Sequence, residues 1–180
     1  MAQTIFREGR DHDQANPALG EAHKNGFTDL TGEQWTTLMQ LIDNQKNNGT
    51  EKLNGKSYVE WIVDTGCSNH MTPRKDLMTD VYNVPGVPVR LPNGQLIEAT
   101  NEGTVNLGKN LQLGEVLLVP TLNCNLLSVS QLLHDHNYKV TFTSNFCVIQ
   151  DLTSMTLIGA SRQENGVYVF RVLDLSLIHI

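Results

Sequence analysis

The 180-residue sequence lacks several features that would assign a protein to a class at once. It has three cysteines, an odd number at wide spacing with no CxxC pair, which predicts neither a disulfide framework nor a zinc site. No apolar run approaches the ~20 residues that cross a bilayer. The 13 basic residues are outnumbered by 19 acidic ones, and the net charge of -6 argues against binding to a phosphate backbone. We therefore expect free thiols in a reducing, cytosolic compartment and no membrane partner.

The start of the chain is predicted to be a spacer, residues 1–57, that is mostly disordered and carries one helix. Residues 1–30 are polar, show little periodicity and are unlike a signal peptide. The stretch 44–56 is rich in Asn, Gly and Lys and is typical of a linker. The helix is therefore expected to lie outside the main domain.

That helix is predicted over residues 31–46. Thr31 and Gln34 have the spacing of a capping box. One face of the helix is apolar at helical spacing, which indicates a packing face or an intermolecular contact. The residues of this face are Trp35, Leu38, Met39 and Ile42.

From residue 58 onward the pattern changes to short strands, which predicts an all-β domain. Many short strands at ~8–12-residue spacing are typical of a compact barrel or sandwich. Asn93-Gly94 between two β-rich segments predicts a tight hairpin. One helical segment, residues 129–136, interrupts the strands. The predicted strands are residues 58–63, 87–91, 95–99, 103–107, 111–119, 138–143, 146–151, 156–159 and 167–172.

The apolar run Trp61-Ile62-Val63 leads directly into Asp64-Thr65-Gly66, a candidate catalytic loop. Aspartic proteases use two carboxylates that share one proton, one as general base on water and the other to polarise the scissile carbonyl. The Thr65 hydroxyl can bond across to a partner loop, and Gly66 permits close approach of the backbone. The tripeptide alone indicates only a strand and a turn. It occurs once, so this chemistry requires a second copy of the chain.

Three further features follow in the order that a retropepsin requires. The hairpin with Asn93-Gly94 at its tip suits a flap over an active site. A strand that ends at Val119-Pro120 comes next. The apolar pair Leu126-Leu127 is then followed by Ser128 and a short helix, where retropepsins have a hydrophobic segment that threads under the catalytic loop.

Together these residues resemble a known family. The segment from Trp61 to Thr72 closely resembles the protease start of copia-type LTR retrotransposon polyproteins. The resemblance continues through Leu91-Pro92-Asn93-Gly94 and through residues 125–132, and it covers about residues 58–170. The helix over residues 31–46 resembles the spacer that precedes the protease in plant members.

The resemblance implies a retropepsin-like acid-protease β-barrel or sandwich with one short helix, plus the N-terminal helix on a flexible extension. It divides the chain into the spacer 1–57, a protease domain over residues 58–153, and trailing strands over residues 154–180 towards the pre-integrase region. It implies an aspartic endopeptidase that cleaves its own Gag-Pol polyprotein as a homodimer in a cytoplasmic virus-like particle. It implies no cofactor and no metal.

The family's functional residues carry over by position. Asp64 is the implied catalytic carboxylate, Thr65 the residue that bonds across the dimer, and Gly66 the turn. The implied substrate-binding residues are those of the flap and of the threading segment: Leu91, Pro92, Asn93, Gly94, Gln95, Leu126, Leu127 and Ser128. Cys67 departs from the family, which often has Ala there, and Leu173 to Ile180 does not continue the resemblance. We expect a truncated segment of the polyprotein with an aberrant end.

Other interpretations of the same residues remain open. The domain could be a catalytically silent β-barrel that acts as an interaction module. A nucleic-acid-binding segment is the third alternative, opposed by the net charge. His70 is interpreted as fixing the loop by hydrogen bonds or as exposed, rather than as a catalytic or metal-binding residue, and Cys67 as a passive small residue rather than a nucleophile. His134 and His136 point to different faces of a short helix, which argues against a shared metal site.

Overall fold

The computed structural model describes residues 30–47, 58–91, 93–108 and 110–173. The predicted disorder of residues 1–30 and the predicted linker fall almost wholly outside this part of the chain. From Thr31 onward the described residues cluster into one compact unit. The predicted domain boundaries at residues 57/58 and 153/154 stay predictions.

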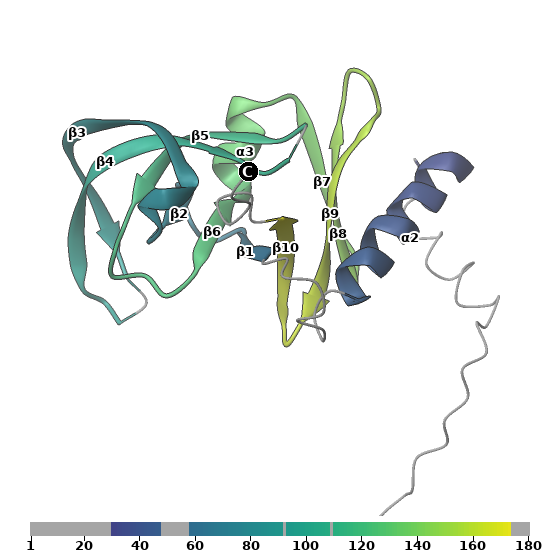
Figure 1. Cartoon of the computed structure of the whole chain (residues 1–180), viewed down its shortest axis with the longest axis horizontal. Helices are drawn as coiled ribbons and strands as arrows, with labels where there is room; N and C mark the ends of the chain where they lie inside the picture. The colour runs from purple at the N-terminus through teal and green to yellow at the C-terminus, as the bar shows by residue number, and fades with distance from the viewer. Residues whose placement is uncertain (1–29, 48–57, 92, 109, 174–180) are drawn as a thin grey trace, which may run out of the picture. The chain divides into compact units, whose positions relative to one another are not determined.

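The described residues form a ten-stranded sheet with two α-helices and one short 3-10 helix (Figure 1). The helices are α2 (Gly32–Asn47), η1 (Lys75–Leu77) and α3 (Val129–Asp135). The strands are β1 (Tyr58–Asp64), β2 (Met71–Thr72), β3 (Met78–Arg90), β4 (Leu96–Asn106), β5 (Gln112–Leu118), β6 (Asn125–Ser128), β7 (Tyr138–Phe142), β8 (Phe146–Asp151), β9 (Leu157–Glu164) and β10 (Val167–Leu173). This confirms the predicted all-β class with one short helix inside the strand region and a helix before it.

The centre of the sheet is a crossing of segments that are distant in sequence. The strand order is β3-β4-β5-β2-β6-β1-β10-β9-β8-β7. β6 runs parallel to β1 and antiparallel to β2, so it lies between the two strands that flank the Asp64 loop. Figure 1 shows β3, β4 and β5 on one side of this crossing and β7, β8 and β9 on the other. The predicted threading segment is therefore a strand at the middle of the sheet.

The predicted hairpin is confirmed as the β3–β4 pair. The strands run antiparallel, with Arg90 opposite Leu96 next to the turn. The Leu91 amide donates to the Gln95 carbonyl over 2.8 Å, and the Gly94 amide donates to the Leu91 carbonyl over 2.9 Å. Gly94 has a φ of +83°, a conformation that residues with a Cβ adopt with strain. The Asn-Gly signal thus forms the turn for the reason that the sequence suggested.

Two apolar clusters hold the sheet together. The larger lies where β1, β5, β6, α3, β8 and β10 pack, with Trp61 and Leu127 completely buried. The smaller joins the β3–β4 hairpin to β2 and β5 through Val89, Met71 and Leu117. Because both clusters use residues of the central crossing, apolar burial fixes that crossing from two sides.

The helix α2 packs on the domain rather than lying outside it. Its capping box is formed, because the Gln34 amide donates to Thr31 Oγ1 and the Thr31 amide donates to Gln34 Oε1. The helix contacts β9, and its Leu38 and Ile42 side chains have no exposed surface. Figure 1 shows α2 beside β8 and β9. The expectation of a separate appendage was wrong because a linker composition does not say where a helix packs.

An ion-pair cluster also joins β10 to its two neighbours in the sheet. Arg171 donates from Nε to Glu60 of β1 over 2.9 Å and from its terminal nitrogens to Glu164 of β9 over 2.5 and 2.6 Å. The Arg171 guanidinium lowers the pKa of Glu164. None of the described helices is long and apolar enough to cross a membrane.

Candidate active site

The Asp64-Thr65-Gly66 loop leaves the end of β1 at the centre of the sheet. Asp64 is the last residue of β1 and lies opposite Ser128, the last residue of β6. Its side chain is partly buried, whereas Thr65 and Gly66 are exposed. The carboxylate is therefore held at the sheet but open on one side, as a group that reacts with a bound substrate must be.

Gly66 makes a direct hydrogen bond to the Asp64 carboxylate. Its amide donates to Asp64 Oδ1 over 2.6 Å. A Cβ at this position would lie 3.2 Å from the same oxygen, tighter than an ordinary contact. A backbone amide that donates to a carboxylate fixes the orientation of that carboxylate. Glycine is therefore favoured at this position because it lets the backbone come close to the Asp64 carboxylate.

Below the loop lies a buried hydrogen-bond cluster, here called the clamp, formed by His70, Ser128 and Gln131. The Ser128 amide donates to His70 Nδ1 over 3.0 Å, and the His70 amide donates to Gln131 Oε1 over 2.6 Å. Ser128 Oγ donates to the Cys67 carbonyl over 2.7 Å and accepts from the Gln131 amide, which caps α3. The clamp therefore ties the loop after Asp64 to β6 and to α3.

A second buried pair fixes the return of the chain into β2. Thr72 Oγ1 donates to Asn125 Oδ1 over 2.6 Å, and Asn125 Nδ2 donates to the Glu60 carbonyl over 2.8 Å. Thr72 is completely buried and Asn125 nearly so. Because Glu60 is in β1, this pair joins β1, β6 and β2 at the other end of the loop.

The flap and threading residues divide between surface and interior. Leu91 and Leu126 are partly buried and belong to one apolar cluster with Cys67. Asn93, Gly94 and Gln95 are exposed at the hairpin tip, and Pro92 lies outside the described residues.

Two of the predicted substrate-binding residues lie in the interior of the single chain. Leu127 and Ser128 have no exposed surface, and they pack beneath the loop. Their contact with substrate stays a prediction. The pair alternates as a strand requires, so Leu126 and Leu127 point to opposite faces of β6.

Cys67 does not have the environment of a nucleophile. Burial and the nearby Asp64 carboxylate raise the pKa of its thiol to about 11, and Sγ donates to the Asp64 carbonyl. The imidazole of His70 accepts from Ser128 instead, and the described contacts include no hydrogen bond between it and Cys67. A thiol held protonated is a poor nucleophile. The passive interpretation of Cys67 agrees with this geometry.

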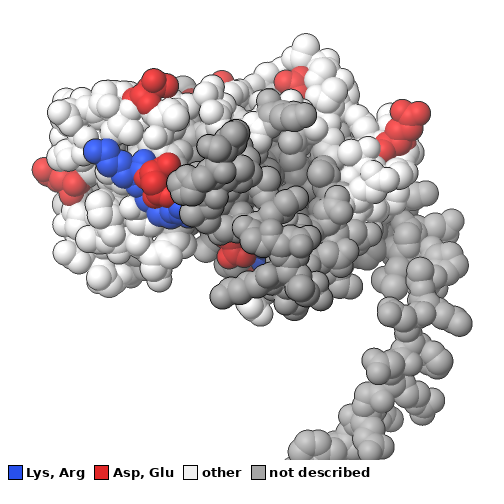
Figure 2. All heavy atoms as spheres, viewed as in Figure 1, with Lys and Arg blue, Asp and Glu red and all other residues white. Residues whose placement is uncertain are grey.

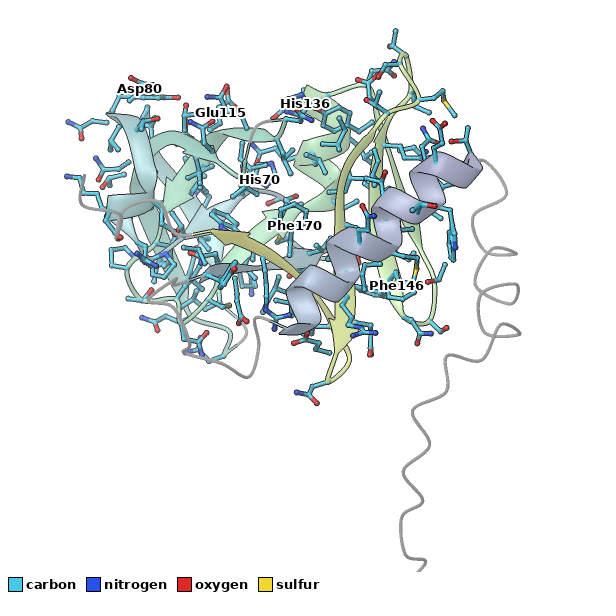
Figure 3. The ribbon with its side chains drawn as sticks, turned by 45° about the vertical axis from the view of Figure 1, so that its right-hand side comes forward. His70, Asp80, Glu115, His136, Phe146 and Phe170 are labelled. Carbon is cyan, nitrogen blue, oxygen red and sulfur yellow. The ribbon has the colours of Figure 1, made fainter. Side chains whose placement is uncertain are left out.

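The other two described histidines, His134 and His136, belong to α3 and its C-terminal end rather than to the loop. His134 Nδ1 is 3.1 Å from Asp135, and the ring of His136 stacks on Tyr138. Figure 3 shows His136 at the upper edge with Glu115, while His70 lies in the interior. Among the described residues there is no group of three or more His, Cys, Asp or Glu side chains arranged to hold a metal ion.

Three residues that support the loop were missed by sequence reasoning. These are Thr72, Asn125 and Gln131. Their side chains form hydrogen bonds with groups that are 53 to 65 positions away in the sequence. Their sequence signal was weak: each is a polar residue inside or beside an apolar segment. A polar residue in such a place must find a partner when it is buried, which was the available hint.

The segment that contains this site is similar to a known protein family. Residues 61–138 match the family model described as Pol polyprotein, beta-barrel domain. The match takes in β1 from Trp61, the Asp64 loop, the β3–β4 hairpin, β6 and α3. It covers less than half of the chain and leaves out α2 and β8 to β10.

Two curated proteins from transposons are also similar to this chain. The retrovirus-related Pol polyprotein from transposon RE2 of Arabidopsis thaliana is 29% identical over 114 residues, 60% of this chain and 8% of that protein. The transposon Ty5-1 protein of Saccharomyces cerevisiae is 37% identical over 70 residues, 39% of this chain and 47% of that protein. The alignments thus span less than half the length of either relative. No solved structure matches the chain significantly. These similarities support a retrotransposon Pol polyprotein segment that contains a beta-barrel domain.

Proposed function

We propose that the chain is the protease segment of a copia-type retrotransposon polyprotein, an aspartic endopeptidase that acts as a homodimer. The observation that carries the proposal is the position of Asp64. It ends a central strand, receives the Gly66 amide, and is flanked by β6, which passes between the two strands that the loop connects. Such a crossing holds a carboxylate rigidly at an open edge of the loop.

The chemistry requires two such loops. In the proposed dimer, one Asp64 carboxylate takes a proton from water, which attacks the scissile carbonyl. The Asp64 carboxyl of the second copy is protonated and donates to the carbonyl oxygen. Like charges a few Å apart cannot both ionise, so the pair titrates as a unit with two separated pKa values. We expect activity at mildly acidic pH, where the pair holds one proton.

The apolar cluster beside the loop suits an extended peptide. Leu91 at the hairpin and Leu126 on β6 are partly exposed and join Cys67 in this cluster. In the proposal the hairpin tip, Asn93 to Gln95, closes over the bound peptide. The substrate is the element's own Gag-Pol polyprotein, cleaved inside a cytoplasmic particle.

Replacement of Asp64 by Asn tests the proposal. Asn keeps an oxygen that can accept from the Gly66 amide but cannot serve as the base, so peptide cleavage should fall by roughly 10²–10⁴-fold. The matched control is Asp76→Asn, which removes an exposed carboxylate that pairs with Arg74 and should leave cleavage unchanged. Undiminished cleavage by Asp64→Asn would remove Asp64 from the mechanism.

A second candidate is an interaction module with no catalysis. The description of the matching family as a beta-barrel domain, rather than as a protease, favours it. A chain that stays monomeric at high micromolar concentration and cleaves no Gag-derived peptide would support this candidate over the protease.

Nucleic-acid binding finds less support. On the face shown in Figure 2, the basic side chains of the described residues lie beside acidic side chains and form no continuous basic surface. Recognition of a phosphate backbone uses a continuous basic surface. Salt-dependent binding to single-stranded RNA at near-physiological ionic strength would revive this alternative.

A further inference from the structure

The clamp contains a titratable side chain with no part in the proposed chemistry. His70 has 1% of its surface exposed and lies six positions after the catalytic carboxylate on the same loop. Figure 3 shows it inside the domain. A buried imidazole costs free energy unless its nitrogen atoms are used, and here Nδ1 is used to accept a backbone amide.

We propose that His70 is a positioning residue for Asp64, and that protonation of its imidazole on Nδ1 releases the catalytic loop. The proposal rests on the protease function proposed above. In the neutral form, His70 holds Ser128, and Ser128 holds the loop. In the protonated form, this connection is lost and the carboxylate is no longer fixed for catalysis.

The connection from His70 to Asp64 runs through three bonded steps. The Ser128 amide donates to His70 Nδ1, which fixes the end of β6. Ser128 Oγ then donates to the Cys67 carbonyl on the loop. Cys67 is covalently joined to Gly66, and the Gly66 amide donates to Asp64 Oδ1.

Ser128 also lies directly opposite Asp64 in the β1–β6 pair. A shift of Ser128 therefore reaches the carboxylate along the strand pair as well as through the loop.

The direction of the Ser128 bond identifies the tautomer. Because Nδ1 accepts, the single proton of the neutral ring is on Nε2. A second proton, taken from solvent at acidic pH, must go to Nδ1. Two donors, the new N–H and the Ser128 N–H, would then face each other, and a positive charge would be left in the interior. The structure can accommodate this charge only if the clamp opens.

The charges around His70 oppose its protonation only in part. Burial lowers the pKa of His70 to about 4, and it outweighs Asp135, which raises this pKa. His136 lowers this pKa further. β5 packs on the loop, with the Leu117 amide donating to the His70 carbonyl, and its one carboxylate, Glu115, is exposed. On the loop itself, the nearest titratable side chains are Asp64 and Cys67. The clamp is therefore stable near neutral pH and opens on acidification.

Two substitutions of His70 separate its role as a hydrogen-bond acceptor from the protonation of its imidazole. His70→Asn places an amide oxygen where Nδ1 lies, so it can accept from Ser128 but does not titrate. His70→Leu has similar size and no acceptor. The control is His134→Asn, because the His134 side chain is 88% exposed and its described polar contact is with Asp135.

The deciding experiment is the pH profile of kcat/KM for peptide cleavage by the four proteins. We expect the acidic limb of wild type to move to lower pH in His70→Asn, by on the order of one pH unit. His70→Leu should lower kcat at every pH with little change in KM, and His134→Asn should follow wild type. An acidic limb that is identical in wild type and His70→Asn would overturn the proposal.

A measurement that needs no activity separates this proposal from the protease function. The amide NMR signals of Ser128, Gln131 and Leu117, whose amides donate to groups of the clamp rather than to the Asp64 carboxylate, are followed from pH 7 to pH 4 in wild type and in His70→Asn. We expect all three to shift together in wild type and to stay in place in His70→Asn. Equal shifts in both proteins would overturn the positioning role, whereas absent cleavage with the expected shifts would count against the protease function alone.

Discussion

The two sides of the sheet differ in how well their buried polar side chains are hydrogen-bonded. In the loop region, residues 61–138, five buried polar side chains bond to groups that are distant in sequence: His70, Thr72, Asn125, Ser128 and Gln131. In the outer region, β8 to β10 with α2, Gln150 Nε2 is buried and has no protein partner among the described residues, and buried Ser161 Oγ has only the Cys147 sulfur, a weak acceptor. Trp61 Nε1 is the one such atom in the loop region.

This difference in hydrogen bonding indicates a different structural role for each region. A connected set of buried hydrogen bonds favours one arrangement of the chain, because any other arrangement leaves polar groups unpaired. Apolar packing is more tolerant of shape and needs no fixed pairing. The loop region therefore holds Asp64 in one position, while the outer region supplies mainly apolar burial. The predictions below test this division.

The largest loss of stability is expected in the outer region. Leu38→Ala removes a completely buried side chain between α2 and the sheet and should lower the free energy of unfolding by about 3–4 kcal/mol. Urea unfolding measures it, with Gln40→Ala on the exposed face of α2 as the control. A loss under about 1 kcal/mol would show that α2 does not stabilise the domain.

A smaller but still large loss is expected from the loop region's polar pair. Asn125→Ala leaves the buried Thr72 hydroxyl without its acceptor and should cost about 2–3 kcal/mol. The control is Asn101→Ala, since the bond from Asn101 to Asn83 is on the surface and should cost under about 0.5 kcal/mol. If the two substitutions cost the same, the buried pair has no special role.

The stability of wild type should also depend on pH through His70. Its pKa is about 4 in the folded chain and near 6.5 when unfolded, so the unfolded chain binds the proton first as the pH falls. The stability from this group is present above pH 6.5 and is lost between 6.5 and 4, by about 2–3 kcal/mol. Urea unfolding at several pH values measures the loss. His70→Asn should lack this component, and an equal slope in both proteins would contradict it.

The smallest effect is expected where a buried polar group has only a weak partner. Ser161 lies opposite Cys147, whose thiol is a weak acceptor and whose pKa burial raises to about 12. Ser161→Ala removes a hydroxyl that is poorly paired, so stability should change by less than about 0.5 kcal/mol or rise. A clear loss by thermal unfolding would place a hydrogen bond there and weaken the contrast between the regions.

Much of the strand pattern could be predicted, because alternation and turn residues are local signals. Phe146–Asp151 was predicted with its observed bounds. The first half of β3 was missed because Pro85-Gly86 suggests a break. β3 lies at the edge of the sheet, where a proline costs no ladder bond. Asn165-Gly166 turns β9 into β10, with both residues at positive φ, and this signal was overlooked.

The candidate site could be predicted only in part. Asp64 and the hairpin tip carry local motifs, so the sequence alone placed them. The bonds from Thr72 to Asn125 and from His70 to Gln131 join segments that are 53 and 61 positions apart. Which partners meet depends on the crossing of β1, β6 and β2, and nothing in a local pattern encodes that choice. The packing of α2 on β9 was missed for the same reason.

The central claim is that Asp64 is half of an active site that a second copy completes. Mixing tests it most directly: wild type is kept at a fixed concentration while Asp64→Asn is added, and peptide cleavage is measured. Mixed dimers contain one carboxylate at the site, so cleavage per wild-type chain should fall steadily as the variant is added. Cleavage that stays constant while the variant is added would contradict the account, because it would show that one copy of the chain carries a complete site.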